Sequence, residues 1–154
     1  MRASNLQVAA LPVRWTGGRP EMLLVTTRGT GRWTPPKGWP IGDAPSAACA
    51  AREAFEEAGV SGRIEPEALG VFEYWKQTRR GRDVLRVSAF VLHVDAMARD
   101  WPERAERKRA WFFPEVAAKL VGNEQLGALI RNAALVCTPS EAWPEPLRAA
   151  GFSR

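Results

Sequence analysis

Cysteine and histidine are scarce in this chain. Its 154 residues include two cysteines, Cys49 and Cys137, and a single histidine, His93. Two cysteines do not make the disulfide framework that stabilises many small secreted domains. So few thiolate and imidazole groups also disfavour a zinc site, because zinc prefers sulfur and nitrogen ligands. We expect His93, which falls on a predicted strand, to have a structural role.

Long apolar runs are also missing. No stretch is long enough to cross a bilayer, and the N-terminal segment lacks the apolar core of a secretory signal. We therefore expect a cytoplasmic protein with no membrane partner. The length suits one domain over residues 1–154, and a hydrophobic content of 45% is ordinary for a chain with a single buried core.

Positive charge exceeds negative charge. Lysine and arginine together number 22, against 17 aspartates and glutamates, which gives a formal net charge of +5. This balance favours anionic partners, such as phosphate compounds, nucleic acid or a membrane surface. Charge alone does not select among them.

The hydrophobic pattern predicts strands and helices that do not strictly alternate. Aliphatic and β-branched runs predict strands at 6–15, 21–28, 69–76, 84–94 and 107–113, with a short strand at 33–34. Helical spacing predicts helices at 45–58, 114–121 and 123–136. Residues 29–44 are predicted as a loop and residues 137–154 as a loosely ordered tail. This order of elements indicates an α+β fold with a mixed-sheet sandwich.

Glycine and proline mark the predicted ends of several elements. The segments 16–20 and 77–83 contain turn-forming glycines, so each is predicted to close a hairpin. Gly59 is predicted to end the helix at 45–58 in the left-handed conformation. Pro114 is predicted to open the next helix in its first turn.

Three glutamates crowd the second half of the predicted helix at 45–58. On a helical wheel of about 100° per residue, Glu53, Glu56 and Glu57 fall within an arc of about 100°. The opposite face carries mostly small residues: Ala47, Ala48, Ala51, Ala54, Phe55 and Ala58. We expect that face to pack against the sheet and the acids to point away from it.

A solvated surface is the ordinary explanation for such acids, but it fits this helix poorly. Glu53 and Glu57 are like charges one turn apart, and negative charge near a helix C-terminus opposes the helix dipole. A bound divalent cation would remove the repulsion. Carboxylates at this spacing suit Mg²⁺ or Mn²⁺, which take oxygen ligands and keep several waters for a phosphate substrate.

The residues around these acids extend the pattern. Gly38 is followed, after thirteen residues, by the segment REAFEEAGV at 52–60. Together they resemble the Nudix box, whose pattern is G-x5-E-x7-R-E-U-x-E-E-x-G-U, with U an aliphatic residue. One position departs from it. The first glutamate of the pattern is Ala44 here, with Asp43 beside it as a partial substitute.

The resemblance implies an α/β/α sandwich with a mixed sheet, in which the box forms a catalytic loop–helix–loop. It also implies hydrolysis of a diphosphate linked to a further group. The implied ligands of Mg²⁺ or Mn²⁺ are Glu53, Glu56, Glu57 and the backbone carbonyl of Gly38. Glu53 or a neighbouring box glutamate would deprotonate or orient the attacking water, and Arg52 would hold the glutamates by ion pairing.

A narrower resemblance covers roughly residues 8–121. The segments 23–38, 77–94 and 100–112 look like the diphosphoinositol polyphosphate phosphohydrolase branch, which also acts on diadenosine polyphosphates. This likeness implies a polyphosphorylated small-molecule substrate. The candidates to bind its phosphates are Arg28, Arg32, Lys37, Arg82, Arg107 and Arg109. The candidates to stack on a base, or to act as packing anchors, are Trp33, Trp39, Trp75 and Trp111.

Two other functions remain open. A Nudix enzyme that trims RNA 5′ pyrophosphates would suit the basic charge, but no RNA-binding motif is present, so we expect no stable nucleic-acid partner. A non-enzymatic binding module is suggested by Ala44 alone. Both a monomer and a homodimer are compatible with the sequence.

Overall fold

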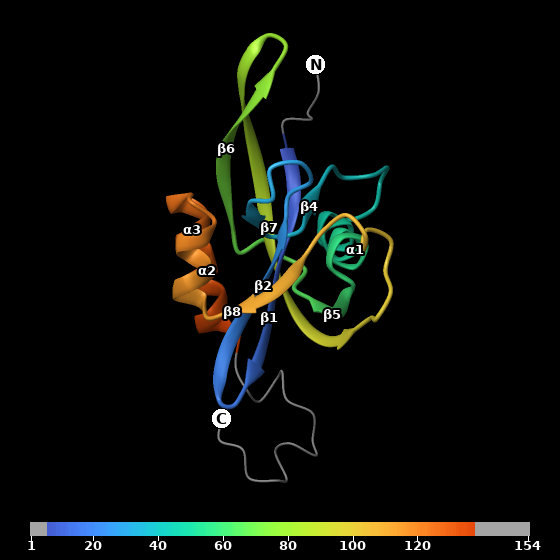
Figure 1. Ribbon diagram of the computed structural model, residues 1–154, viewed down its shortest axis with the longest axis vertical. Helices are drawn as coiled ribbons and strands as arrows, with labels where there is room; N and C mark the ends of the chain where they lie inside the picture. The colour runs from blue at the N-terminus through green and yellow to red at the C-terminus, as the bar shows by residue number, and fades with distance from the viewer. Residues whose placement is uncertain (1–5, 138–154) are drawn as a thin grey trace.

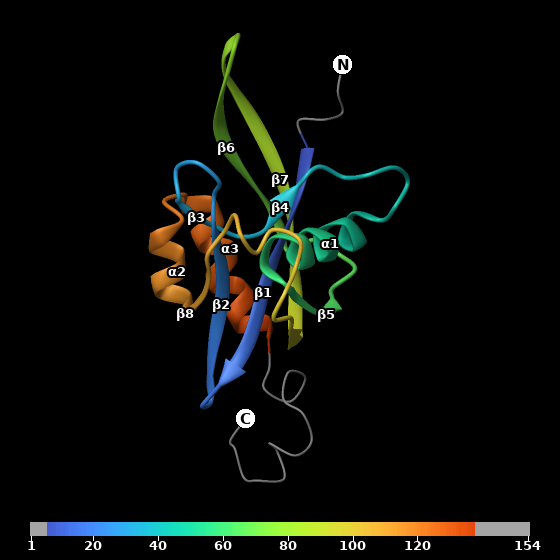
Figure 2. The ribbon, with the colours of Figure 1, turned by 45° about the vertical axis from the view of Figure 1, so that its right-hand side comes forward.

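A computed structural model describes residues 6–137 of the chain. In chain order the elements are β1 (Leu6–Thr16), β2 (Arg19–Thr26), β3 (Trp33–Thr34), β4 (Lys37–Gly38), α1 (Ser46–Ala58), β5 (Val60–Ile64), β6 (Gly70–Thr78), β7 (Gly81–Met97), β8 (Arg109–Phe112), α2 (Pro114–Leu120) and α3 (Glu124–Val136). The strands form one eight-stranded sheet, with α1 on one face and α2 and α3 on the other (Figures 1 and 2). The predicted α+β class and the three-layer α/β/α sandwich are confirmed.

The centre of the sheet is formed by β1 and β7. These strands run parallel from the Leu6–Arg86 pair to the Val13–His93 pair, whereas the other strand pairs of the described sheet are antiparallel. Because helices cover both faces, β1 is buried continuously from Gln7 to Val13. The mixed sheet expected from the sequence is therefore present.

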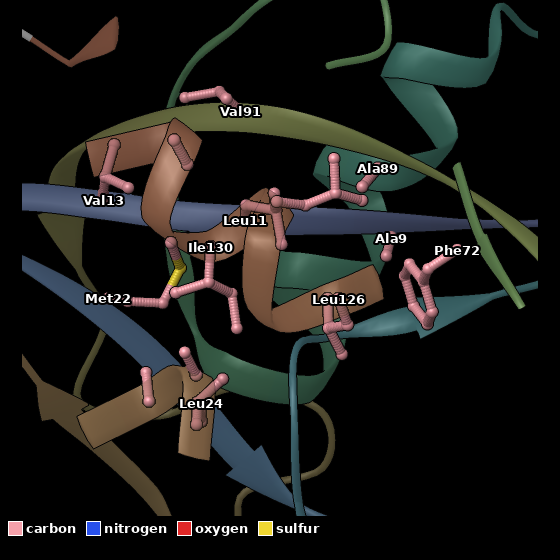
Figure 3. Packing of buried hydrophobic residues seen from close by; sticks show 14 of the residues in the cluster. Ala9, Leu11, Val13, Met22, Leu24, Phe72, Ala89, Val91, Leu126 and Ile130 are labelled. Carbon is pink, nitrogen blue, oxygen red and sulfur yellow. The ribbon is translucent and has the colours of Figure 1, made fainter. Parts of the chain in front are cut away.

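Two buried clusters fill the space between the sheet and the helices. Toward α2 and α3, Leu11 of β1 packs in one cluster with Met22, Leu24 and Ile130 (Figure 3). Toward α1, the cluster contains mainly small side chains on the helix and aliphatic side chains on the strands. The small side chains let α1 lie close to the sheet.

The packing face of α1 differs from the predicted one. Ala50, Ala54 and Ala58 form a fully buried stripe, whereas Phe55 is 41% exposed. Glu53 and Glu57 flank this stripe and are only 8% and 6% exposed. The prediction that the acids point away from the packing is therefore wrong for these two residues. Alanines one turn apart fit the sheet more closely than a face containing the bulky Phe55, so the helix is rotated toward its acidic side.

Most predicted boundaries agree with the structure to within a few residues. Gly59 ends α1 with a φ of 67° and donates its N–H to the Phe55 carbonyl at 2.9 Å, as predicted. Pro114 lies in the first turn of α2, also as predicted. The sequence pattern does not predict the short strands β4 and β5. The strands β6 and β7 are longer than predicted, and only Arg79 and Arg80 separate them.

The first residue of the predicted tail belongs to the folded domain. Cys137 is buried, and its carbonyl accepts a hydrogen bond from Trp15 Nε1 at 2.8 Å. Residues 138–154, the rest of the predicted tail, lie outside the described residues. Within residues 6–137, no helix combines the length and the apolar character that crossing a bilayer requires.

Candidate active site

Glu53 lies against the short strand β4. A Cβ atom placed on Gly38 would come within 2.5 Å of the Glu53 carboxyl carbon and 2.6 Å of both carboxylate oxygens. Any side chain at position 38 would displace this carboxylate, so glycine is what allows Glu53 to lie in this position. The pairing of Gly38 with Val8 of β1 fixes the contact. The glycine and the helical acids of the box therefore meet in space.

Arg52 connects two of the glutamates. Its guanidinium donates from Nη2 to Glu53 Oε2 at 2.9 Å and from Nη1 to Glu56 Oε2 at 2.6 Å. These ion pairs fix both carboxylates relative to the helix. They engage one oxygen of each carboxylate.

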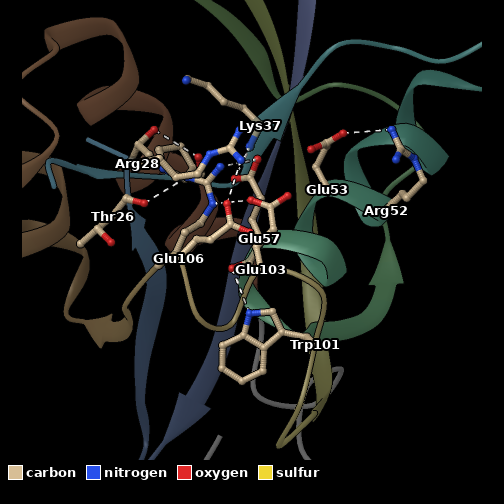
Figure 4. A network of polar contacts seen from close by, with 12 residues as sticks. Thr26, Arg28, Lys37, Arg52, Glu53, Glu57, Trp101, Glu103 and Glu106 are labelled. Atoms are coloured by element: carbon tan, nitrogen blue, oxygen red, sulfur yellow. Dashed lines mark hydrogen bonds and ion pairs between the residues drawn. The ribbon is translucent and has the colours of Figure 1, made fainter. Parts of the chain in front are cut away.

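The Glu57 carboxylate is buried between β4 and the loop that joins β7 to β8 (Figure 4). Its Oε1 accepts a hydrogen bond from the Lys37 backbone N–H at 3.3 Å, and its Oε2 lies 3.5 Å from Arg107 Nη2. Burial, reinforced by the charges of Glu53 and Glu103, raises the pKa of Glu57 to about 8 despite the nearby Arg107. Burial also raises the pKa of Glu53. The nearby arginines thus do not fully compensate the negative charge of Glu53 and Glu57.

The loop between β7 and β8 supplies a further acid, Glu103, which the box motif does not contain. Its Oε1 accepts a hydrogen bond from Arg107 Nε at 2.7 Å, and its backbone N–H donates to the Glu56 carbonyl at 3.0 Å. Trp101 of the same loop donates from Nε1 to the Glu57 carbonyl at 3.2 Å. These contacts hold the loop on the last turns of α1. The only sequence signal for Glu103 is its spacing of four residues from Arg107 in a family-like segment.

We call Glu53, Glu57 and Glu103 the acidic cluster. Two of the arginines predicted to bind phosphate lie beside it with their guanidinium groups engaged. The Arg107 side chain is 9% exposed and contacts Glu57 and Glu103. Arg109 donates to two backbone carbonyls of the α1 end and the β7–β8 loop and stacks 3.8 Å from the centre of the Trp101 ring.

An open pocket of about 460 Å³ lies on the other side of β4. Its lining includes four aromatic and two cationic side chains: Trp33, Phe72, Tyr74, Trp75, Arg32 and Lys37. The turn between α2 and α3 and the start of α3 complete the lining. We call this the aromatic pocket. Two predicted phosphate ligands, Arg32 and Lys37, therefore lie together.

The other two predicted cations lie outside this lining. Arg28 pairs with Glu106 at 2.9 Å, and both side chains are largely exposed. Arg82 lies on the β6–β7 hairpin, with its guanidinium carbon 4.7 Å from the centre of the Trp75 ring. The structure therefore divides the six predicted cations among four places.

Lys37 connects the aromatic pocket to the acidic cluster. Its backbone N–H donates to Glu57, while its Nζ lies 4.8 Å from the centre of the Tyr74 ring. Burial lowers the pKa of Lys37 against the opposing effect of Glu57, and the positive charges of Lys76, Arg107 and Arg32 lower it further. The pocket thus has an excess of positive charge.

Two further aromatic candidates and the histidine lie elsewhere. Trp111 packs on the core beneath α1, and the Arg14 guanidinium carbon lies 4.0 Å from its ring centre. Trp39 is not among the lining residues of the pocket. His93 is buried in β7, and its Nε2 lies 2.7 Å from Glu65 Oε2.

The chemistry of the acidic cluster fits a hard divalent cation. Carboxylate and carbonyl oxygens are the ligands that Mg²⁺ and Mn²⁺ prefer, and the raised pKa values show that additional positive charge would be stabilised here. In the described part of the chain, no three His, Cys, Asp or Glu side chains converge on one point. Arg52 forms an ion pair with Glu53, and Arg107 forms one with Glu57. Ala44, where the box pattern has a further glutamate, is exposed before α1.

Comparisons with known proteins agree on one family. The family model described as NUDIX domain matches residues 4–133. "Nudix hydrolase 21, chloroplastic" of Arabidopsis thaliana is 35% identical over 121 residues, which cover 75% of this chain and 59% of that protein. "Diphosphoinositol polyphosphate phosphohydrolase 3-alpha" of Mus musculus is 38% identical over 104 residues, which cover 66% and 60%. The chain spans about three fifths of the length of these relatives.

A solved structure shares the architecture. The crystal structure of the C. elegans Ap4A hydrolase matches with a TM-score of 0.59 and 21% identity, over 86% of this chain and 98% of that one. The fold and the box on α1 together define a protein of the Nudix type. The match over residues 4–133 settles the family: this chain belongs to the Nudix family.

Proposed function

We propose that this chain is a metal-dependent pyrophosphohydrolase that cleaves a phosphoanhydride bond in a polyphosphorylated small molecule. One observation carries the proposal: Lys37 joins a buried cluster of carboxylates to a pocket lined by aromatic and cationic side chains. The two sides have opposite and incompletely compensated charge. A divalent cation with a bound polyphosphate supplies both missing charges.

The acidic side is the proposed metal site. The proposed ligands are those of the family pattern, with one addition from the β7–β8 loop: the Gly38 carbonyl, Glu53, Glu56, Glu57 and Glu103. When bound, Mg²⁺ or Mn²⁺ neutralises charge on the phosphate oxygens and lowers the pKa of a coordinated water. Arg52 and Arg107 position the carboxylates through the ion pairs described above.

A carboxylate of the box handles the proton. Glu53 or Glu57 accepts a proton from the attacking water or orients that water toward phosphorus. The loop that carries Trp101 and Glu103 is hydrogen-bonded to this end of α1.

The substrate phosphates are proposed to lie at the basic side. Arg32 and Lys37 are the proposed direct ligands because both line the aromatic pocket. Arg28 and Arg82 would contact more distant phosphates. Arg107 is reassigned to positioning of the acids, since its guanidinium is buried against them. Arg109 is likewise reassigned to positioning, because it holds the β7–β8 loop on the end of α1.

Two substrate classes have specific support. The name of the mouse relative states diphosphoinositol polyphosphates, and the cations of the pocket suit a densely phosphorylated ligand. The aromatic lining suits a nucleobase, as in a diadenosine polyphosphate.

A substrate panel tests the proposal. The chain is incubated with diadenosine polyphosphates, diphosphoinositol phosphates, nucleoside diphosphate sugars and triphosphorylated RNA, with and without Mg²⁺ or Mn²⁺, and the products are separated by anion-exchange chromatography. We expect metal-dependent cleavage of a phosphoanhydride bond in the small polyphosphates. The matched variants are Glu57→Gln in the acidic cluster and Glu67→Gln on the exposed surface.

The alternatives give different results on the same panel. Preferred cleavage of triphosphorylated RNA would make the chain an RNA pyrophosphohydrolase. Binding of small polyphosphates without cleavage at any metal concentration would support the binding module suggested by Ala44. Equal activity of Glu57→Gln and Glu67→Gln would refute the proposed metal site.

A further inference from the structure

The outer part of the β6–β7 hairpin extends beyond the rest of the sheet (Figures 1 and 2). Pairing of β7 with β1 begins at Arg86, whereas pairing of β6 with β7 continues outward from Glu73–Arg86 to Thr78–Gly81. Within the described residues, positions 73–86 therefore form a two-stranded extension, here called the arm. Six residues of strand correspond to a length of about 20 Å.

The arm is strongly basic. It contains five cations and two acids: Lys76, Arg79, Arg80, Arg82, Arg86, Glu73 and Asp83. Glu73 pairs with Arg86 at 3.5 Å at the base of the arm. No ion pair of the described residues involves the other four cations.

Protection of a sheet edge by charged side chains explains part of this composition. It does not explain Trp75, which is 59% exposed on the same arm. A large exposed ring works against this protection, because apolar surface on an edge strand promotes association with other chains. An isolated two-stranded hairpin is also only marginally stable in water, and uncompensated like charge weakens it further. A ligand-binding role accounts for both features.

Trp75 lies where the arm meets the aromatic pocket. Its side chain is part of the pocket lining, together with Lys37 and Arg32. Arg82 is diagonal to Trp75 across the two strands and lies over its ring. A guanidinium over an indole places a positive charge next to a flat aromatic ring. The proposed phosphate ligands and this pair are therefore neighbours.

We infer that the arm is a second binding element for the substrate. In it, Trp75 and Arg82 hold the aromatic base of the nucleoside at the far end of a polyphosphate chain. This inference rests on the proposed function. Cations alone would bind a phosphorylated cyclitol equally well, but an exposed indole beside a guanidinium recognises a planar base. The arm thus selects dinucleoside polyphosphates over diphosphoinositol phosphates.

The test compares a dinucleoside tetraphosphate with a mononucleoside tetraphosphate, which has the same phosphate chain but no second base. Trp75→Ala is expected to raise KM for the dinucleotide on the order of 10-fold and to raise KM for the mononucleotide much less, because the mononucleotide has no second base to lose contact with. Arg82→Gln is expected to raise the same KM several-fold. The double variant should lose less than the product of the two single effects, since the pair acts together.

A similar pair provides the matched control. Arg19 lies over the Phe113 ring at 3.8 Å, and neither residue lines the aromatic pocket. Arg19→Gln and Phe113→Leu should leave both KM values unchanged. Equal effects of Trp75→Ala on the two nucleotides, no effect on either, or equal effects of the control variants would each overturn the inference. An effect of Trp75→Ala confined to triphosphorylated RNA would overturn it in favour of an RNA-binding arm.

The wild-type protein distinguishes failure of the proposed function from failure of this inference. If it cleaves no polyphosphate, calorimetric titration with the same two nucleotides replaces the kinetics. Tighter binding of the dinucleotide than of the mononucleotide, lost in Trp75→Ala, would support the arm even then. Equal binding of the two nucleotides by the wild type would overturn it.

Discussion

The acidic cluster and the aromatic pocket, which meet at Lys37, show opposite electrostatic behaviour. In the cluster, burial and like charge raise the pKa of Glu57 to about 8. In the pocket, burial and neighbouring cations lower the pKa of Lys37. Each region therefore disfavours its own charged form. The first lacks positive charge and the second lacks negative charge.

An ordinary acid elsewhere in the molecule behaves differently. Glu65, which is partly exposed, is hydrogen-bonded to His93 and accepts a hydrogen bond from Arg63, and these partners lower its pKa. Its charge is compensated by the protein itself. The contrast indicates that the uncompensated charge near Lys37 is a property of the site. A metal–polyphosphate complex would supply a cation to one region and anions to the other.

The largest expected effect is on catalysis by the acidic cluster. Glu57→Gln keeps the shape of the side chain and its hydrogen bond to the Lys37 N–H but removes the charge. We expect a loss of turnover of at least about 100-fold, because a group that stabilises charge in the transition state is removed. The melting temperature should not fall, since a buried, poorly compensated charge is removed as well. Turnover and thermal unfolding are measured together; wild-type turnover would contradict the metal site.

Arg107 should matter for folding, in contrast to Arg28. Arg107→Ala leaves Glu57 and Glu103 without their cation, so we expect the free energy of unfolding to fall by roughly 1.5–3 kcal/mol. Arg28→Ala removes an exposed ion pair with Glu106, which solvent screens, and should lower the free energy of unfolding much less than Arg107→Ala does. Urea denaturation of both variants gives the comparison. A larger loss for Arg28→Ala would show that the buried network is not what stabilises this region.

Lys37→Met tests the basic side. The apolar part of the side chain is kept, but one charged contact to the substrate is lost, so KM should rise about 10-fold. Stability should be unchanged or higher, because the charge of a half-buried lysine is removed. Steady-state kinetics and thermal unfolding check both parts. An unchanged KM would exclude Lys37 as a phosphate ligand.

The smallest expected effect concerns Ala44. The retained glutamates suffice for Mg²⁺, which is normally held by one or two carboxylates and by substrate phosphates. Ala44→Glu adds an acid before α1 and should lower, by a few-fold, the metal concentration that gives the half-maximal rate. Asp43→Ala should raise that concentration if Asp43 already supplies part of the charge. If the wild type is inactive and Ala44→Glu is active, the wild-type protein is better explained as a binding module.

Local patterns predicted the elements that carry the box. Helical spacing and Gly59 locate α1, and the spacing of the three glutamates indicates a cation site without reference to the fold. The orientation of α1 was not predictable from the same pattern, because the wheel placed Phe55 among the packing residues. Which stripe packs is decided by the fit of alanines to the sheet.

Long-range contacts explain what the sequence did not predict. Glu103 reaches α1 only because the β7–β8 loop folds over its last turns, and nothing near Glu103 in the sequence specifies that path. For the same reason the sequence predicts Arg107 as a phosphate ligand and does not predict that its guanidinium is buried against Glu57 and Glu103. The short strand β4, with two residues, carries too little pattern to be recognised.

The most direct measurement of the central claim is Mn²⁺ binding in the absence of substrate. Isothermal titration calorimetry is carried out on the wild type, on the double variant Glu53→Gln/Glu57→Gln, and on the exposed control Glu67→Gln. We predict that the wild type and the control bind Mn²⁺ equally and are stabilised by it against heat, whereas the double variant shows neither effect. Binding of Mn²⁺ to the double variant with wild-type affinity would contradict the account.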